Sequence, residues 1–250
     1  MSVNGLSQFH PDAAGIYQGG KSIYGAPLGI LMLDARFPRI PGDMGNAQSW
    51  TFPVLYKIVK GASPDRVVLR GAQGTLDMFI DAARELVDLG AEGITTNCGF
   101  LALFQRELQE SVPVPVVTSS LLQVAQVQRA LAPGKRVGVV TISAQSLTPR
   151  HLEAAGVPPD TPIMGTESGV EFSRVILGDE LTLDRAKAES DVVGAAVSLV
   201  QAHAEVGAIV LECTNMCPYA AAVRRATGLP VFDIYSLVNW FQLGLAPREF

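Results

Sequence analysis

The chain has 250 residues, of which 48% are hydrophobic and 17% charged, a balance typical of a folded globular protein rather than a disordered one. The formal net charge of −5, without a clustered run of Lys or Arg, argues against a nucleic-acid partner. Apolar runs end well short of the roughly 20 residues that a membrane span needs, so no membrane partner is expected. Three cysteines do not make a disulfide framework, and together with a polar N-terminus they favour a cytoplasmic location.

The first part of the chain is expected to hold an arm, a buried strand and a binding loop. Residues 1–26 are rich in glycine and polar residues and are predicted to form an N-terminal arm. The segment 27–34 is apolar up to Asp34, which predicts a fully buried strand that ends on a carboxylate. The loop 35–49, which contains Asn46, is rich in Pro and Gly, and long polar loops of this kind often bind ligands.

Strands and helices alternate along the rest of the chain. Apolar residues recur at helical spacing over 75–89, and Gly90 ends this pattern as a helix C-cap does. The other elements predicted before residue 132 are a short helix over 50–59, a short strand over 66–70, strands over 93–96 and 114–118, and helices over 100–108 and 119–131. A second series starts at residue 136, with strands over 136–142, 162–164, 208–212 and 230–232, and helices over 148–155, 170–177, 183–206, 219–227 and through Trp240.

This alternation predicts an α/β protein with parallel sheets and right-handed crossovers. Because the series restarts near residue 136, the chain is predicted to form two pseudo-symmetric halves. The first half is expected to cover 27–118 together with 228–250, and the second half 119–227.

Two short segments repeat the same chemistry. Thr96, Asn97 and Cys98 follow one predicted strand, and Cys213, Thr214 and Asn215 follow another. Small polar residues between a strand and a helix lie at the carboxyl edge of a sheet, where side chains and helix-start amides can meet a ligand. One such segment in each half predicts an active site in the cleft between the halves.

The two cysteines suggest proton transfer. A thiol near a helix N-terminus has its thiolate favoured, and two thiols on opposite sides of one carbon can remove and deliver a proton. The neighbouring Thr and Asn side chains offer hydrogen-bond donors to a carboxylate, and no metal or organic cofactor is required. Glu212 is either a local base or a salt-bridge partner. Cys217 is expected to pack in the core, because the three histidines lie far away in sequence.

These motifs resemble a known superfamily. The segments Thr-Thr-Asn-Cys-Gly-Phe at 95–100 and Glu-Cys-Thr-Asn-Met at 212–216, with Gly-Ile-Leu-Met-Leu-Asp at 29–34, are similar to the aspartate/glutamate racemase superfamily. That group also includes hydantoin racemases, maleate isomerases, arylmalonate decarboxylases and a dimethylsulfoniopropionate lyase. The resemblance implies two Rossmann-like halves, cofactor-independent proton transfer and a homodimer.

The resemblance also implies roles for single residues. Cys98 and Cys213 would form the acid/base pair. The small carboxylate substrate would be held by polar residues of both halves, namely Thr96, Asn97, Thr141, Ser143, Thr214 and Asn215. Asp34 lies where members of the superfamily often carry an acidic group, and the loop around Asn46 is similar to the lyase branch.

The first motif departs from the usual order, which is Cys-Asn-Thr in amino-acid racemases. Here Thr96 occupies the usual thiol position and Cys98 lies two residues later. If Thr96 faces the reacting carbon, Cys213 acts alone, as in the decarboxylase branch. If Cys98 reaches the pocket, racemisation and elimination are both open. The sequence therefore predicts a racemase or epimerase of a small carboxylate such as an acidic amino acid, with a lyase or decarboxylase as the alternative and a non-enzymatic small-molecule sensor as a third.

Overall fold

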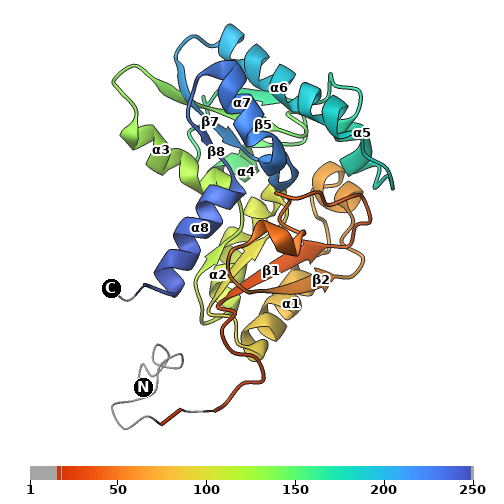
Figure 1. Ribbon diagram of the computed structural model, residues 1–250, viewed down its shortest axis with the longest axis vertical. Helices are drawn as coiled ribbons and strands as arrows, with labels where there is room; N and C mark the ends of the chain where they lie inside the picture. The colour runs from red at the N-terminus through yellow and green to blue at the C-terminus, as the bar shows by residue number, and fades with distance from the viewer. Residues whose placement is uncertain (1–15, 18, 249–250) are drawn as a thin grey trace.

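The computed structural model describes residues 16–17 and 19–248. It contains two four-stranded sheets, one in each lobe of the molecule (Figure 1). The strand orders are β2-β1-β3-β4 and β6-β5-β7-β8, and the neighbouring strands pair in parallel. In each sheet the four strands therefore follow one another in the same spatial order, with the second strand of the half at the edge beside the first. The predicted α/β class with two similar parallel halves is confirmed.

The first sheet is organised around β1 (Leu28–Leu33), which is buried along its whole length. Side chains alternate between the two faces of a strand, and Leu28 and Ile30 contact a different apolar cluster from Leu31 and Leu33. The other strands of this sheet are β2 (Val54–Val59), β3 (Gly93–Thr96) and β4 (Val116–Val117). A strand buried on both faces explains why the sequence of β1 is apolar without alternation.

Helices cover both faces of the first sheet. The face with Leu31 packs in the same cluster as α1 (Leu76–Leu89), which ends at Gly90 with a φ of 115°, a left-handed conformation that favours glycine. The face with Leu28 packs against α8 (Ile234–Leu245). A shorter helix, α2 (Gln105–Ser111), follows β3 after a 3-10 segment.

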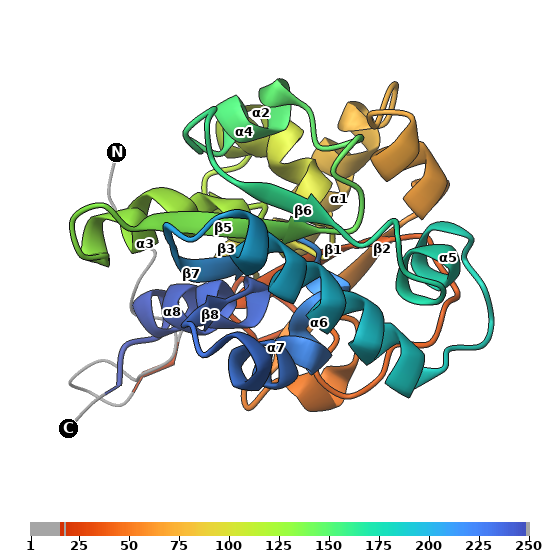
Figure 2. The ribbon, with the colours of Figure 1, turned by 90° about the horizontal axis from the view of Figure 1, so that it is seen from above.

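The second sheet repeats the pattern. Its strands are β5 (Arg136–Thr141), β6 (Ile163–Gly165), β7 (Val206–Leu211) and β8 (Val231–Phe232). Its helices are α3 (Val124–Ala130), α4 (Pro149–Ala154), α5 (Phe172–Leu177), α6 (Arg185–Ala202) and α7 (Ala220–Thr227). Figure 2 shows α6 and α7 side by side on one side of this sheet and α4 on the other.

Two predicted elements are wrong. The segment 50–59, predicted as a helix, contains strand β2, which pairs in parallel with β1 and so gains a full ladder of backbone hydrogen bonds. The segment 66–70, predicted as a strand, is a single π-helical turn over Asp65–Leu69. Val67 and Val68 are buried in that turn, so their apolar character reflects packing rather than strand pairing.

The C-terminal segment links the two halves. The prediction assigned 228–250 as a whole to the first half; β8 pairs with β7 in the second sheet, whereas α8 packs on the first. Residues 1–15 and 18 of the predicted arm lie outside the described residues. Within its described part, Lys21 Nζ donates to the carbonyl of Gly90 (3.2 Å) and to Glu92 (3.1 Å). Among the described helices, none combines the length and the apolar character that crossing a membrane requires.

Candidate active site

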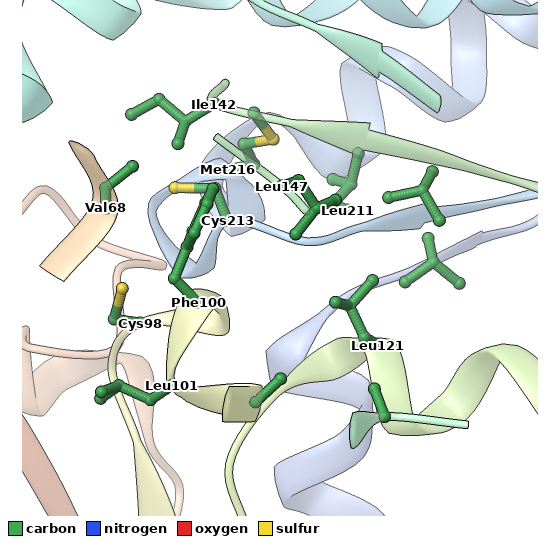
Figure 3. Packing of buried hydrophobic residues seen from close by; sticks show 14 of the residues in the cluster. Val68, Cys98, Phe100, Leu101, Leu121, Ile142, Leu147, Leu211, Cys213 and Met216 are labelled. Carbon is green, nitrogen blue, oxygen red and sulfur yellow. The ribbon is translucent and has the colours of Figure 1, made fainter. Parts of the chain in front are cut away.

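A small cavity lies between the two halves. Both Cys98, which follows β3, and Cys213, which follows β7, line it. In Figure 3 the two side chains come from separate segments, and both sulfur atoms point towards the side on which Val68 is drawn; Val68 also lines the cavity. The structure thus brings the two thiols of the two motifs to one site.

Thr96 does not line this cavity. It is fully buried, and its Oγ1 lies 2.6 Å from the carbonyl of Thr118 and 3.0 Å from that of Cys98. These bonds tie the end of β3 to the segment after β4 and fix the turn that carries Cys98. The sequence left open whether Thr96 or Cys98 faces the site. In the structure Cys98 lines the cavity and Thr96 does not.

The two motifs contact each other directly. Thr214 Oγ1 donates a hydrogen bond to the carbonyl of Asn97 at 2.5 Å. The side-chain Oδ1 of Asn97 accepts from the backbone N–H of Leu33 at 2.7 Å, at the end of β1. Asn97, Thr214 and Asn215 all line the cavity, so these predicted polar residues lie together at the site.

A buried acidic residue in the loop after β1 supports the second motif. Asp43 accepts hydrogen bonds from Arg39 Nη1 (2.9 Å), the backbone N–H of Gly45 (2.7 Å) and Asn215 Nδ2 (2.5 Å). Asn215 Oδ1 in turn accepts from Cys213 Sγ at 3.6 Å. Asp43 therefore fixes the amide that holds the Cys213 thiol. The sequence marked this loop as a binding loop but gave no signal that singled out Asp43 or Arg39.

Two residues predicted from this part of the chain lie outside the cavity lining. Asp34 accepts from the backbone N–H of Gly61 (3.0 Å) and pairs with Lys60 (3.4 Å) at the surface. Asn46 accepts from the N–H of Gln48 (3.0 Å) and so caps a short 3-10 helix. Both side chains stabilise the local backbone.

The two predicted residues at the end of β5 also lie outside the lining. Ser143 Oγ donates to Ser146 Oγ at 2.9 Å. Thr141 is fully buried, and its Oγ1 donates to Glu212 Oε2 at 2.7 Å. Thr141 therefore reaches the cavity through Glu212, which does line it.

The electrostatics of the cavity favour neutral groups. Burial, with the nearby Glu212, raises the pKa of Cys98 to about 12 and raises the pKa of Cys213 well above its usual value. Burial also raises the pKa of Glu212 to about 7, although the hydrogen bond from Thr141 opposes the shift. Burial outweighs the helix-start effect expected from the sequence, so both thiols are held in their protonated form.

The rest of the cavity lining is mostly apolar, including Leu33, Phe37, Phe100, Ile142 and Ile176. No Lys, Arg or His occurs among the described residues that line it. Within the described chain, no group of three or more His, Cys, Asp or Glu side chains is placed to hold a metal ion. Cys217 lies outside the lining and packs in the cluster that contains Trp50 and α8.

Solved structures with this fold include racemases and a decarboxylase. Allantoin racemase from Klebsiella pneumoniae matches with a TM-score of 0.61 and 17% identity, over 88% of this chain and 90% of that one. Arylmalonate decarboxylase matches with a TM-score of 0.55 and 19% identity, over 89% and 93%. A glutamate racemase from Bacillus anthracis matches with a TM-score of 0.55 and 14% identity, over 88% and 82%. The fold is that of the aspartate/glutamate racemase superfamily, as the sequence motifs predicted.

Sequence relatives define the family more closely. A dimethylsulfoniopropionate lyase from Durusdinium sp. clade D is 30% identical over 88% of this chain and 75% of its own length. Dimethylsulfoniopropionate lyase 3 from Emiliania huxleyi is 34% identical over 85% of this chain and 58% of its own length, so the match spans less than two thirds of that relative. No protein-family model matches the chain. The chain belongs to the family of these lyases.

Proposed function

We propose that this protein is a lyase that removes the α-proton of a small carboxylate and expels a leaving group from the β-carbon. Dimethylsulfoniopropionate, which names the activity of its relatives, is the substrate class that we assign to it. The observation that carries the proposal is that Cys98 and Cys213, one from each half, line the same enclosed cavity.

The cavity suits such a substrate in charge and polarity. Glu212 is the acidic residue in a lining that is otherwise apolar or neutral, and Phe100 also lines the cavity. A carboxylate side chain and an aromatic face both attract a sulfonium cation. At the other end of the substrate, Asn215 has a second N–H on Nδ2, besides the one that it donates to Asp43, for the substrate carboxylate. The surrounding apolar residues exclude water and strengthen these interactions.

The reaction needs one base. A thiolate removes the proton on the carbon next to the carboxylate, the electrons of that C–H bond form the double bond, and the sulfide leaves with the electrons of the C–S bond. One proton is released for each substrate consumed. Because a sulfonium leaves as a neutral sulfide, its departure needs no acid, and the second thiol serves to hold the substrate.

A second candidate is a racemase, which the pair of thiols also favours. In that reaction one thiolate removes the α-proton, and the thiol on the opposite face delivers another. The two reactions differ in the substrate. After it loses its α-proton, an amino acid without a good β-leaving group cannot eliminate, so it is protonated again at the α-carbon. The neighbouring structures with this fold include such racemases.

The test is incubation of the purified protein with dimethylsulfoniopropionate, with dimethyl sulfide measured by gas chromatography and acrylate by NMR. We expect both products in equal amounts, and neither from the Cys98→Ser variant. A parallel incubation with aspartate, glutamate and allantoin in deuterium oxide detects racemisation as α-deuteration without a smaller product. Deuteration of one of these compounds, with no dimethyl sulfide, would replace the lyase by the racemase.

A further inference from the structure

Glu212 is a buried carboxyl group that joins the two cysteine motifs. It follows β7 and precedes Cys213, and its side chain lines the cavity with an exposed fraction of 0%. Oε2 accepts from Thr141, whereas Oε1 has no hydrogen-bond partner among the described residues. Burying a polar atom without a hydrogen-bond partner costs folding free energy. We therefore expect the unpartnered oxygen of Glu212 to have a function in the cavity.

The free oxygen of Glu212 points at the first motif. If position 99 carried a Cβ, that atom would lie 2.2 Å from Glu212 Oε1, so only glycine allows this approach. Gly99 directly follows Cys98. The carboxyl group of the second motif is therefore packed against the backbone beside the thiol of the first.

The surroundings of the two thiols differ. Cys213 Sγ donates to Asn215 Oδ1, which holds its proton in place. At Cys98 the backbone N–H groups of Phe100 and Leu101 and the charge of Arg39 act in the opposite sense, since each lowers the pKa of this thiol. At Cys213 the backbone N–H of Asn215 acts in the same sense. Although burial raises the pKa of both thiols, Cys98 is thus the one with more groups that offset the cost of its anion.

Several charged and titratable groups surround Glu212, and they determine how much negative charge the cavity can hold. Cys98 and Cys213 share the cavity with it, Asp43 is hydrogen-bonded to Asn215 behind Cys213, and Arg39 pairs with Asp43. Burial and mutual repulsion make a second negative charge in the cavity unfavourable. A thiolate beside an ionised Glu212 would be such a second charge.

We propose that Glu212 accepts the proton of Cys98 and so creates the thiolate base without adding charge to the cavity. The S–H bond breaks, the proton forms an O–H bond on Oε1, and the electron pair stays on sulfur. The transfer removes the negative charge next to Cys98. The Cys98 thiolate then takes the α-proton of the substrate, and Glu212 loses its proton to water as the products leave, which restores the starting state. Cys213 remains a thiol throughout. The removal of the substrate α-proton by the Cys98 thiolate rests on the proposed function. The proton transfer from Cys98 to Glu212 does not depend on it.

Glu212→Gln tests this role, because it keeps the size of the side chain but cannot accept a proton. We expect kcat for the lyase reaction to fall by about 10²–10⁴-fold. The acidic limb of the pH–rate profile, where wild-type activity falls as Glu212 becomes protonated, should disappear from the residual activity. Glu212→Asp keeps a carboxyl group and should retain more activity than the Gln variant. Equal activity of the Gln variant and the wild type would overturn the proposal.

A second readout requires no substrate. Thiolate formation is followed by ultraviolet absorbance against pH in the Cys217→Ser background, so that Cys98 and Cys213 are the only thiols that contribute. Tyrosine ionisation is followed separately at its longer wavelength and subtracted. Because Glu212→Gln removes a like charge, the thiols should ionise at lower pH than in the wild type, even though activity falls. Easier ionisation with unchanged or higher activity would make Glu212 only a source of repulsion and would overturn the proposal. Unchanged ionisation would overturn it as well, because Glu212 would then not interact with the thiols.

These readouts separate the inference from the proposed function. If the wild type does not cleave dimethylsulfoniopropionate, the lyase assignment fails, whereas the thiol titration still tests the link between Glu212 and Cys98. Should Glu212→Gln fail to fold, as shown by circular dichroism, Glu212→Asp and Thr141→Val replace it. Thr141→Val removes the hydrogen bond that lowers the pKa of Glu212, so the acidic limb should move to higher pH. An acidic limb that stays in place in Thr141→Val would contradict the assignment of this limb to Glu212.

Discussion

Thr214 Oγ1 donates a hydrogen bond of 2.5 Å to the backbone carbonyl of Asn97, and this bond links the two cysteine motifs. Both residues are buried, and each is next to the thiol of its own half. The bond spans 117 positions of the chain, so it forms only when the two halves come together. The alignment of the two thiols on one cavity therefore depends on a contact between the halves.

Replacing Thr214 with Val should destabilise the protein by about 1–3 kcal/mol, because the buried carbonyl of Asn97 loses its donor. The measurement is the free energy of unfolding from urea denaturation. Thr214→Ser keeps the hydroxyl group and is the matched control, with a smaller loss expected from the missing methyl group. Equal stability of the Val variant and the wild type would mean that this bond contributes nothing to holding the halves together.

The three cysteines should respond differently to substitution by Ser. Cys98→Ser should lower kcat by about 10²–10⁴-fold, because a hydroxyl group is a much weaker acid than a thiol and does not supply the base. Cys213→Ser keeps a hydrogen-bond donor at a residue that holds the substrate, so it should mainly raise KM. Cys217→Ser is the matched control, since this residue packs outside the cavity lining. Steady-state kinetics and circular dichroism measure activity and folding separately. An active Cys98→Ser variant would leave Cys213 as the single acid/base residue.

Asp43→Asn tests the support of the second motif. It leaves the partly buried Arg39 without its ionic partner, and losing one partner of a largely buried ion pair costs up to about 3–5 kcal/mol. It also weakens the hold on Asn215, so kcat should fall further than the loss of folded protein explains. Asp34→Asn is the control: this residue forms an exposed pair with Lys60, and its loss should cost less than about 1 kcal/mol. Comparable unfolding curves for the two variants would contradict this assignment.

The sequence predicted those parts of the fold that follow from local patterns. The buried strand β1, the helix α1 with its Gly90 cap and the repeated strand–polar–helix segments are visible in single stretches of sequence. The strand β2 was missed because its conformation depends on pairing with β1, a partner that its own residues do not reveal. Edge strands of parallel sheets are decided by tertiary contacts more than by local preference.

The residues of the candidate site also divide into those that local sequence predicts and those that only tertiary contacts reveal. The sequence identified the two thiols and the adjacent Asn97, Thr214 and Asn215, because these residues follow directly on their strands. It did not predict that Asp43 reaches Asn215, since that contact connects positions 172 residues apart through the path of a loop. It also left the role of Glu212 open, because the role depends on burial and on the closeness of Gly99, which only the packed structure shows.

The buried carboxyl group of Glu212 should make stability depend on pH. In the folded protein burial raises the pKa of Glu212 from its usual 4.5 to about 7, so the folded state prefers the protonated form. The stabilisation is fully present below pH 4.5 and is lost as the pH rises through about 7, because unfolding then lets the carboxyl group ionise in water. The loss should be of the order of 3 kcal/mol across this window.

Glu212→Gln cannot ionise, so its unfolding free energy should lack this decline. The measurement is urea denaturation of both proteins at a series of pH values from 4 to 8, with the difference in unfolding free energy plotted against pH. Relative to the variant, the wild type should lose stability as the pH rises towards about 7. Glu153→Gln, which removes an exposed carboxyl group on α4, controls for the change in net charge and should run parallel to the wild type. Parallel curves for the wild type and Glu212→Gln would mean that Glu212 ionises as it does in water, which is incompatible with a carboxyl group enclosed beside two neutral thiols.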